Sequence, residues 1–441
     1  MSLNEKTRPR RRKHIAGYSA SSSPHSRDSS RNSSSRDSRA GSSDSRSKLP
    51  RAKRISQAVS NLDLNALKQL ARTGDGLQSI RLRRRAWPLL LNFRSLFDAR
   101  DRDVAHSDEK QVELDIVRTN LPKSTEYRKD EAATKKRQEQ LGVVVRTVLR
   151  SYPWLGYYQG FHELSLVFLC VFGSERPATE ASKMVALFFV RDAMSSNLDN
   201  VLLQLQLLYA LLKAVSPEIY AMLTELDVPP FFAISWVLTW FAHDLDDFQD
   251  ICRIFDFLIV SPPLQIVYMA AALIKHNEKE ILGCERDFAI VHTTLAKLPQ
   301  TVNKWKHIIN DSFYLEYDYP ATKLQHMANC HLPKLSAINS YEATWKRLDP
   351  AQPREFISLV PILNNCHPLV SAPTSNAAGK KGTSGRIVEN RMARVIDLTS
   401  TAQKARDLAL QHRWPILFAT VASATMVMYA WLLVQQFQLH P

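Results

Sequence analysis

Two short motifs contain side chains whose types and spacing could do chemistry. In VELDIVRT, Val112, Asp115 and Arg118 follow one another at steps of three residues. In GYYQGFHEL, which begins at Gly156, two tyrosines, a glutamine, a histidine and a glutamate occur close together. A guanidinium stays charged and can neutralise negative charge, and a glutamine amide can both donate and accept hydrogen bonds. A plain core segment does not need so many polar groups, so we expect a functional site.

The first motif predicts one face of a helix. A step of three residues turns a helical side chain by about −60°, so Val112, Asp115 and Arg118 should lie within one third of the circumference. Asp115 could then form an i,i+3 ion pair with Arg118. An ordinary amphipathic helix shows the same pattern, and a surface pair of this kind contributes only about 0.2 to 0.5 kcal/mol.

The second motif predicts a turn that leads into a helix. Tyr157 and Gln159 are two residues apart and would point to nearly opposite sides of a helix, so we expect them at its beginning. Gly156 and Gly160 permit close approach by another backbone. Tyr157 could instead be an aromatic side chain packed under the turn, and Gln159 could make a helix-terminal hydrogen bond.

The elements that must position these motifs are helices. Over residues 56–341 apolar residues recur at steps of three and four, interrupted by Pro, Gly and Asp-Asp pairs, and no strict alternation typical of a strand is found. We therefore predict an all-α domain of roughly a dozen or more helices over this range. Trp236, Trp240 and Phe241 are expected in its core.

The basic charge of the chain is concentrated near its start. Residues 1–54 hold 15 Lys and Arg against 4 Asp and Glu, which accounts for +11 of the formal net charge of +15. The Ser- and Arg-rich arm, residues 1–55, has too few aliphatic residues to offset the entropy of ordering, so we predict that it is disordered. The serines beside arginines favour regulation by phosphorylation. Because the body is nearly neutral, no nucleic acid is expected as a partner.

The C-terminal part changes character twice. Residues 342–386 are rich in Pro, Ser, Asn and Gly and indicate a linker, followed by a juxtamembrane helix over 387–413. Residues 414–434 carry no charge, and a helix of this length spans about 30 Å, the thickness of a hydrocarbon core. We predict a transmembrane helix that acts as a tail anchor, with a buried core helix as the alternative. Basic residues before it and none after it favour the endoplasmic reticulum membrane, with the body facing the cytosol.

No metal site or disulfide framework is indicated. The chain has five cysteines, an odd number, and no C-x-x-C, which is typical of a protein from a reducing compartment. His326, Cys330 and His331 lie close in sequence, but no second ligand pair with a standard spacing accompanies them. Gly379-Lys380 lacks the preceding glycine of a phosphate loop, so we expect no nucleotide-binding loop.

Together, the two motifs resemble the TBC family of Rab GTPase-activating proteins. The family's I-x-x-D-x-x-R signature is matched by Val112, Asp115 and Arg118, with valine in place of isoleucine. Its Y-x-Q signature is matched downstream by Tyr157-Tyr158-Gln159.

Further segments extend this resemblance. GLQSIRLRRRAWPLLL resembles the family's opening, with Arg83 and Trp87 at its R-x-x-x-W positions, and ISWVLTWFAHDL resembles a later core helix. The resemblance covers roughly residues 76–298 and includes features of the endoplasmic-reticulum-anchored branch, which acts on the Rab class of ER-to-Golgi traffic. It implies a multi-helix TBC (Rab-GAP) fold, in agreement with the helical periodicity.

The resemblance also implies roles for the motif residues. Arg118 would neutralise charge on the transferring phosphoryl group, and Gln159 would orient the attacking water. Asp115 would aim Arg118, while Tyr157 would position the loop and contact the Rab, and Val112 completes the supporting set. The partner would be a GTP-bound Rab that itself holds GTP and Mg²⁺, so no cofactor is expected in this chain. It would supply catalytic residues to the GTPase without hydrolysing nucleotide on its own.

Other interpretations concern single residues and the whole chain. His162 and Glu163 could be an acid/base pair, but a loose phosphoryl-transfer transition state needs none, so we assign them to packing or Rab contact. A catalytically silent, membrane-anchored Rab-binding scaffold is the alternative function, although intact Arg118 and Gln159 argue against it. An RNA-processing factor would explain the Ser/Arg arm but not residues 414–434.

Overall fold

The computed structural model describes residues 49–93, 104–119, 121, 131–303 and 305–345, and within them every regular element is a helix. This confirms the all-α prediction for the part of the chain that is described. Among these helices none has the length and hydropathy needed to cross a membrane. The predicted juxtamembrane helix and tail anchor, and nearly all of the predicted linker and arm, lie outside the described residues.

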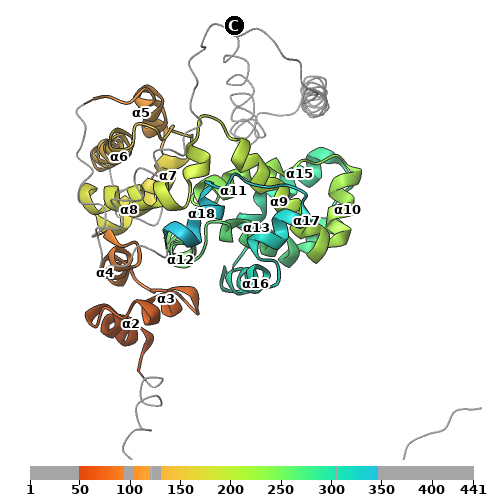
Figure 1. Cartoon of the computed structure of the whole chain (residues 1–441), viewed down its shortest axis with the longest axis horizontal. Helices are drawn as coiled ribbons and strands as arrows, with labels where there is room; N and C mark the ends of the chain where they lie inside the picture. Colours follow the sequence, from red (N-terminus) through yellow and green to blue (C-terminus); the bar gives the residue numbers. More distant parts are fainter. Residues whose placement is uncertain (1–48, 94–103, 120, 122–130, 304, 346–441) are drawn as a thin grey trace, which may run out of the picture. The chain divides into compact units, whose positions relative to one another are not determined.

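Figure 1 shows the helices in chain order, with α labels for α-helices and η for short 3-10 helices. They are α2 (Arg51–Ser60), α3 (Leu64–Arg72), α4 (Ile80–Leu90), α5 (Glu109–Arg118), α6 (Glu131–Ser151), α7 (Phe161–Phe172), α8 (Glu175–Phe188), η3 (Arg191–Met194), α9 (Asp199–Val215), α10 (Pro217–Glu225), η4 (Pro230–Ala233), α11 (Ile234–Thr239), α12 (Phe248–Leu258), α13 (Gln265–His276), α14 (Glu278–Gly283), α15 (Phe288–Thr301), α16 (Trp305–Asp318), α17 (Ala321–Met327) and α18 (Ala337–Thr344).

Local sequence explains where several of these helices begin. An aspartate precedes α3, α12 and α15, and in each case its carboxylate accepts a hydrogen bond from a backbone N–H of the first turn. The first turn of a helix lacks intrahelical acceptors for these N–H groups, so a capping carboxylate stabilises the start by about 1 kcal/mol. The aspartates therefore divide the apolar sequence into separate helices.

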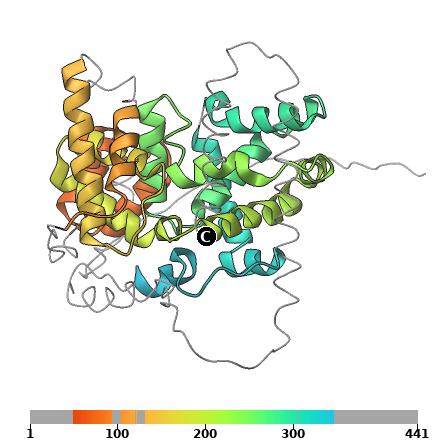
Figure 2. The ribbon, with the colours of Figure 1, turned by 90° about the horizontal axis from the view of Figure 1, so that it is seen from above.

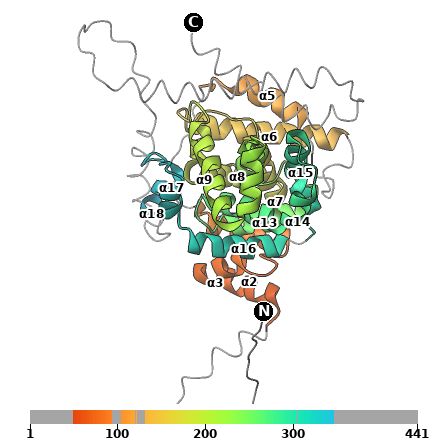
Figure 3. The same ribbon diagram turned by 90° about the vertical axis from the view of Figure 1, so that its right-hand side faces the viewer.

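Helix α7 forms the centre of the part that carries the two motifs. Ten of its twelve residues are buried, so it is apolar on all sides rather than amphipathic. It packs against α8, α6, α4 and α11. Helix α5 lies across α6, at the opposite end of the described domain from α2 and α3 (Figure 3). Seen from above, α6 runs beside α5 (Figure 2). GYYQG leads directly into α7, so the C-terminal end of this loop is attached to the most buried helix of the region.

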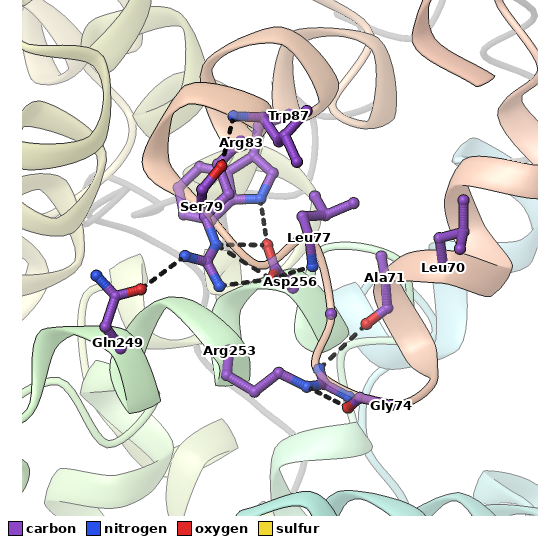
Figure 4. A network of polar contacts seen from close by, with 12 residues as sticks. Leu70, Ala71, Gly74, Leu77, Ser79, Arg83, Trp87, Gln249, Arg253 and Asp256 are labelled. Atoms are coloured by element: carbon purple, nitrogen blue, oxygen red, sulfur yellow. Dashed lines mark hydrogen bonds and ion pairs between the residues drawn. The ribbon is translucent and has the colours of Figure 1, made fainter. Parts of the chain in front are cut away.

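A buried ion pair joins the family-like opening segment to α12 (Figure 4). The Arg83 guanidinium donates to the Asp256 carboxylate, with Nη2 and Oδ2 2.9 Å apart and both side chains almost fully buried. Asp256 also accepts hydrogen bonds from the Trp87 indole Nε1 at 2.8 Å and from the Leu77 backbone at 2.8 Å. Gly76 has a φ of +59°, and a Cβ there would stand 2.5 Å from Asp256 Oδ2. Arg83 and Trp87 of the R-x-x-x-W pattern are thus structural residues.

The helical domain begins earlier than the predicted boundary at residue 56. Arg51 opens α2, and its guanidinium donates to the backbone carbonyl oxygens of Gly76, Leu70 and Thr73. Composition places this arginine with the basic arm, whereas its contacts tie it to α3 and to the turn before α4. At the other end, α18 continues to Thr344, past the predicted end at residue 341.

Candidate functional site

Helix α5 turns the residues of the first motif to different environments. Val112 is fully buried and Asp115 is 4 % exposed, whereas Arg118, the last residue of the helix, is exposed. The predicted helix face is therefore present, with its apolar end inside and its cation at the surface. Within the described residues the Arg118 side chain has no ion pair or hydrogen bond.

The carboxylate of Asp115 binds partners other than Arg118. Its Oδ2 accepts a hydrogen bond from the Tyr157 hydroxyl at 2.9 Å, and its Oδ1 accepts one from Gln111 Nε2 at 3.1 Å. A buried carboxylate needs donors to offset its lost hydration, and these two supply them. The i,i+3 ion pair that the spacing predicts is not among the contacts of the described residues. Asp115 instead positions Tyr157.

Tyr157 attaches the second motif to α5 at two points. Its backbone N–H donates to Asp108 Oδ2 at 2.8 Å, and its hydroxyl donates to Asp115. The same hydroxyl lies 2.7 Å from His162 Nδ1. Because the hydroxyl has one proton and gives it to Asp115, the His162 ring must donate through Nδ1. Burial holds the pKa of the Tyr157 phenol well above its usual range, so the donor proton is retained.

A second ion pair fixes the start of α5. Arg150, near the end of α6, donates to both carboxylate oxygens of Glu109, at 2.6 and 2.7 Å. Hydrogen bonding from Arg150 lowers the pKa of Glu109 to about 2, so the pair stays ionised at neutral pH. Bidentate pairs of this kind fix orientation as well as distance. Helix α5, which carries Arg118, is therefore held against α6.

Gln159 is half-buried and stands between two well-fixed neighbours. Tyr158 is buried and donates its hydroxyl proton to the Leu238 carbonyl at 2.8 Å, at the end of α11. Gly160 has a φ of +118°, and a Cβ there would stand 3.0 Å from Thr239 Cγ2. The close neighbour of Gly160 is a side chain rather than the predicted backbone, and the positive φ favours glycine at this position. No hydrogen bond of the Gln159 amide occurs among the described residues, so the amide can serve an incoming partner.

Replacing Tyr157 with phenylalanine tests this arrangement. Tyr157→Phe removes the donor to a buried carboxylate while keeping the ring. We expect the free energy of unfolding to fall by about 1.5 to 3 kcal/mol, the usual contribution of a hydrogen bond to a charged group. Chemical denaturation would measure the change, with Tyr317→Phe as control because that side chain is 82 % exposed. Equal stability of both variants would contradict the assigned role.

Several supporting residues were not identified from the sequence. Asp108 and Gln111 hold the site together, and His162, assigned from the sequence to packing or Rab contact, hydrogen-bonds to Tyr157 at its centre. Asp108 and Tyr157 are 49 residues apart, so no spacing rule for a single helix could link them. One indication of their role was available in the sequence, which is that Asp108, Gln111 and His162 lie close to the two motifs.

The sequence is similar to that of several known proteins. A family model described as the Rab-GTPase-TBC domain matches residues 80–282, which include both motifs. TBC1 domain family member 20 of Mus musculus is 30 % identical over 374 residues, covering 81 % of this chain and 91 % of the relative. The GTPase-activating protein gyp10 of Schizosaccharomyces pombe is 33 % identical over 259 residues, covering 56 % of this chain and 68 % of the relative.

A solved structure shows the same fold. The Ypt/Rab-GAP domain of Gyp1p aligns with a TM-score of 0.50 at 18 % identity, covering 62 % of this chain and all of that one. Identity at this level supports the architecture rather than the details of the site.

Proposed function

Since this chain belongs to the Rab-GTPase-TBC family of Rab GTPase-activating proteins, we propose that it accelerates GTP hydrolysis by a Rab through two groups of its own, Arg118 and Gln159. The observation that supports this most directly is that the side chains of Arg118 and Gln159 have similar surroundings. Both side chains are free of hydrogen bonds within the described residues, yet both stand on backbone held by buried contacts. Because the backbone at both positions is fixed, only the two side chains have to turn toward the phosphoryl group when a Rab docks.

The proposed role of Arg118 follows from the charge of phosphoryl transfer. The GTPase holds GTP and Mg²⁺, and negative charge spreads over the γ-phosphoryl oxygens in the transition state. A guanidinium brought by a partner neutralises that charge with forked donors. Arg118 is exposed at the end of α5, so a docked Rab could receive it.

The proposed role of Gln159 is to orient the attacking water. Its amide has a donor and an acceptor, which can hold a water between the amide and the phosphoryl group. Tyr158 and Gly160 fix the backbone on either side, so the position from which the Gln159 side chain extends is set before the Rab binds.

The substrate and location are proposed on the sequence resemblance. We take a Rab of ER-to-Golgi traffic as the substrate because LDIVRT, GYYQGFHEL and SWVLTWFAHDL resemble the ER-anchored branch of the family. Residues 414–434 would anchor the chain in the endoplasmic reticulum membrane.

Single-turnover GTP hydrolysis by a panel of GTP-loaded Rabs tests the proposal. The full chain, kept in mild detergent, should accelerate an ER-to-Golgi Rab, and Gln159→Ala should reduce that acceleration about 10²-fold, as loss of one preorganised donor does elsewhere. Gln57→Ala, on the exposed side of α2, is the matched control and should act as the wild type does. Binding of a GTP-loaded Rab without acceleration would instead support the silent scaffold.

A further inference from the structure

The polar contacts of the site continue beyond Tyr157 to a third segment. His162, which donates to Tyr157 through Nδ1, is followed by Glu163, whose Oε1 lies 3.8 Å from the unprotonated His162 Nε2 and makes no hydrogen bond with it. The same Oε1 lies 2.8 Å from His243 Nδ1. His243 belongs to the turn between α11 and α12, 80 residues away along the chain. Hydrogen bonds, together with the backbone between His162 and Glu163, therefore join α5, the Gln159 loop, the first turn of α7 and the turn after α11.

The Glu163 carboxylate does not cap the start of α7, although Glu163 is the third residue of that helix. A glutamate at the third residue of a helix can cap the backbone N–H groups at the start of that helix. Here the residue before α7 makes no side-chain cap, and the Glu163 carboxylate turns to His243. Its second oxygen, Oε2, is buried and has no hydrogen-bond partner within the described residues. A buried acceptor without a donor is costly, and functional sites are where such costs are kept.

The turn that carries His243 is fixed by strained backbone and aromatic packing. Trp240 and Phe241 have φ values of 54° and 64°, in the left-handed region that bulky residues rarely occupy. Both are buried: Trp240 packs on Phe255 at 5.2 Å between ring centroids, and Phe241 packs on Trp305 at 5.0 Å. The surrounding core therefore holds this turn in one conformation, and His243 meets Glu163 from a rigid support.

We propose that the ion pair of Glu163 and His243 is a positioning device for Gln159, which holds the first turn of α7, and with it the loop before it, against the turn after α11. The proposal rests on the proposed function and adds positioning residues to it. Neither residue needs to touch the Rab or the nucleotide. The Gln159 loop is then held on both sides, because Tyr157 bonds to Asp115 of α5 and Glu163 pairs with His243 after α11.

Charge makes this device dependent on pH. The hydrogen bond that His243 donates to the Glu163 carboxylate raises the pKa of His243 to about 9, so the pair is charged at neutral pH although the ring is half-exposed. The charged or titratable groups that interact with the pair are His162 on α7, Asp244 beside His243, and Tyr157 and Tyr158 in the loop before α7. Burial lowers the pKa of His162, so its ring is neutral and leaves His243 as the counter-ion of Glu163. Burial raises the pKa of Asp244 to about 7.

The direction of the pH effect follows from the raised pKa of His243. A histidine whose folded pKa lies above its unfolded value stabilises the folded arrangement below its unfolded pKa, and this contribution is lost as the pH rises through the folded pKa. The acceleration by the wild type, relative to the intrinsic Rab rate, should therefore decline as the pH rises through about 9. Asp244 loses its proton near pH 7 and would influence only the lower part of the profile.

Two variants and their combination test the device in the full chain. Glu163→Gln keeps the shape of the side chain without its charge, and His243→Gln keeps a donor without the cation. We expect Glu163→Gln to lower kcat about ten-fold, because small displacements of a positioned group cost up to about 10²-fold, while KM for the Rab changes less than about two-fold. His243→Gln should show a smaller loss and no decline of the remaining acceleration near pH 9. The double variant should lose no more than Glu163→Gln alone, as coupled residues do.

Arg286→Gln is the matched control, because it breaks an exposed ion pair with Glu225 far from the motifs. It should leave kcat and its pH profile unchanged. A raised KM with unchanged kcat in Glu163→Gln would overturn the proposal in favour of Rab contact. Unchanged kcat and an unchanged pH profile in both variants would overturn it as well. If Glu163→Gln fails to fold, the half-exposed His243 still provides the test. A wild-type chain that accelerates no Rab would refute the proposed function, which is a separate outcome.

Discussion

Arg118→Ala is expected to reduce the acceleration of Rab GTP hydrolysis by about 10³-fold or more. An arginine supplied to a GTPase in trans contributes about 10³ to 10⁵ in rate, which corresponds to at least about 4 kcal/mol of transition-state stabilisation. A surface ion pair would contribute a tenth of that. The loss should appear in kcat, because the guanidinium acts on charge that develops only in the transition state. Single-turnover hydrolysis at saturating amounts of the chain measures it directly.

The controls for this prediction use the same helix. Lys110→Ala removes an exposed cation from α5 without touching the proposed site and should leave the rate unchanged. Arg118→Lys keeps the charge but not the forked donors, so we expect it to recover only part of the activity. Because Arg118 is exposed and has no partner within the described residues, none of these variants should alter the melting temperature. An Arg118→Ala variant within about threefold of wild type would exclude the arginine mechanism.

Asp256→Ala is expected to have the largest effect on stability. It leaves the buried Arg83 cation, the Trp87 indole N–H and the Leu77 backbone N–H without their acceptor. Removing one partner of a buried ion pair costs about 3 to 5 kcal/mol, because the remaining charge is buried without compensation. For a domain of this size each kcal/mol shifts the melting temperature by about 2 to 4 °C. Thermal melting followed by circular dichroism should therefore show a decrease of at least about 6 °C.

A matched carboxylate gives the comparison for Asp256. Glu225→Ala also breaks a carboxylate–arginine pair, with Arg286 at 2.9 Å, but both side chains are more than half exposed. Solvent screens such a pair, so we expect a change within about 0.5 kcal/mol. Similar melting temperatures for the two variants would show that the Arg83–Asp256 pair is dispensable. The result would then leave the R-x-x-x-W pattern without its structural explanation.

Local sequence rules were sufficient to predict the helices and to place Arg118 on the same helix as Asp115. Apolar residues at steps of three and four mark a buried helical face over residues 56–341, and this periodicity does not depend on the rest of the fold. The aspartates that begin α3, α12 and α15 act within their own first turns. Spacing placed Arg118 near Val112 and Asp115 on α5, and the structure shows that its side chain is exposed there.

Contacts between helices were beyond those rules. Spacing alone offers Asp115 only the neighbours on its own helix, and it favoured Arg118. The fold instead supplies a tyrosine hydroxyl 42 residues away, because the buried carboxylate requires buried donors. Arg51 illustrates the same limit, since its composition belongs to the arm and its hydrogen bonds belong to the domain.

The sequence by itself therefore determined the helical class, the two motifs and the family they indicate, because these depend on residue types within a few positions. The tertiary structure alone decided what holds the site in place. It brought Tyr157 to α5 and His243 to Glu163, across 42 and 80 residues, by packing α5, α7 and the turn after α11 together. Which groups meet across such distances depends on how whole helices fill the core, and no local pattern carries that information.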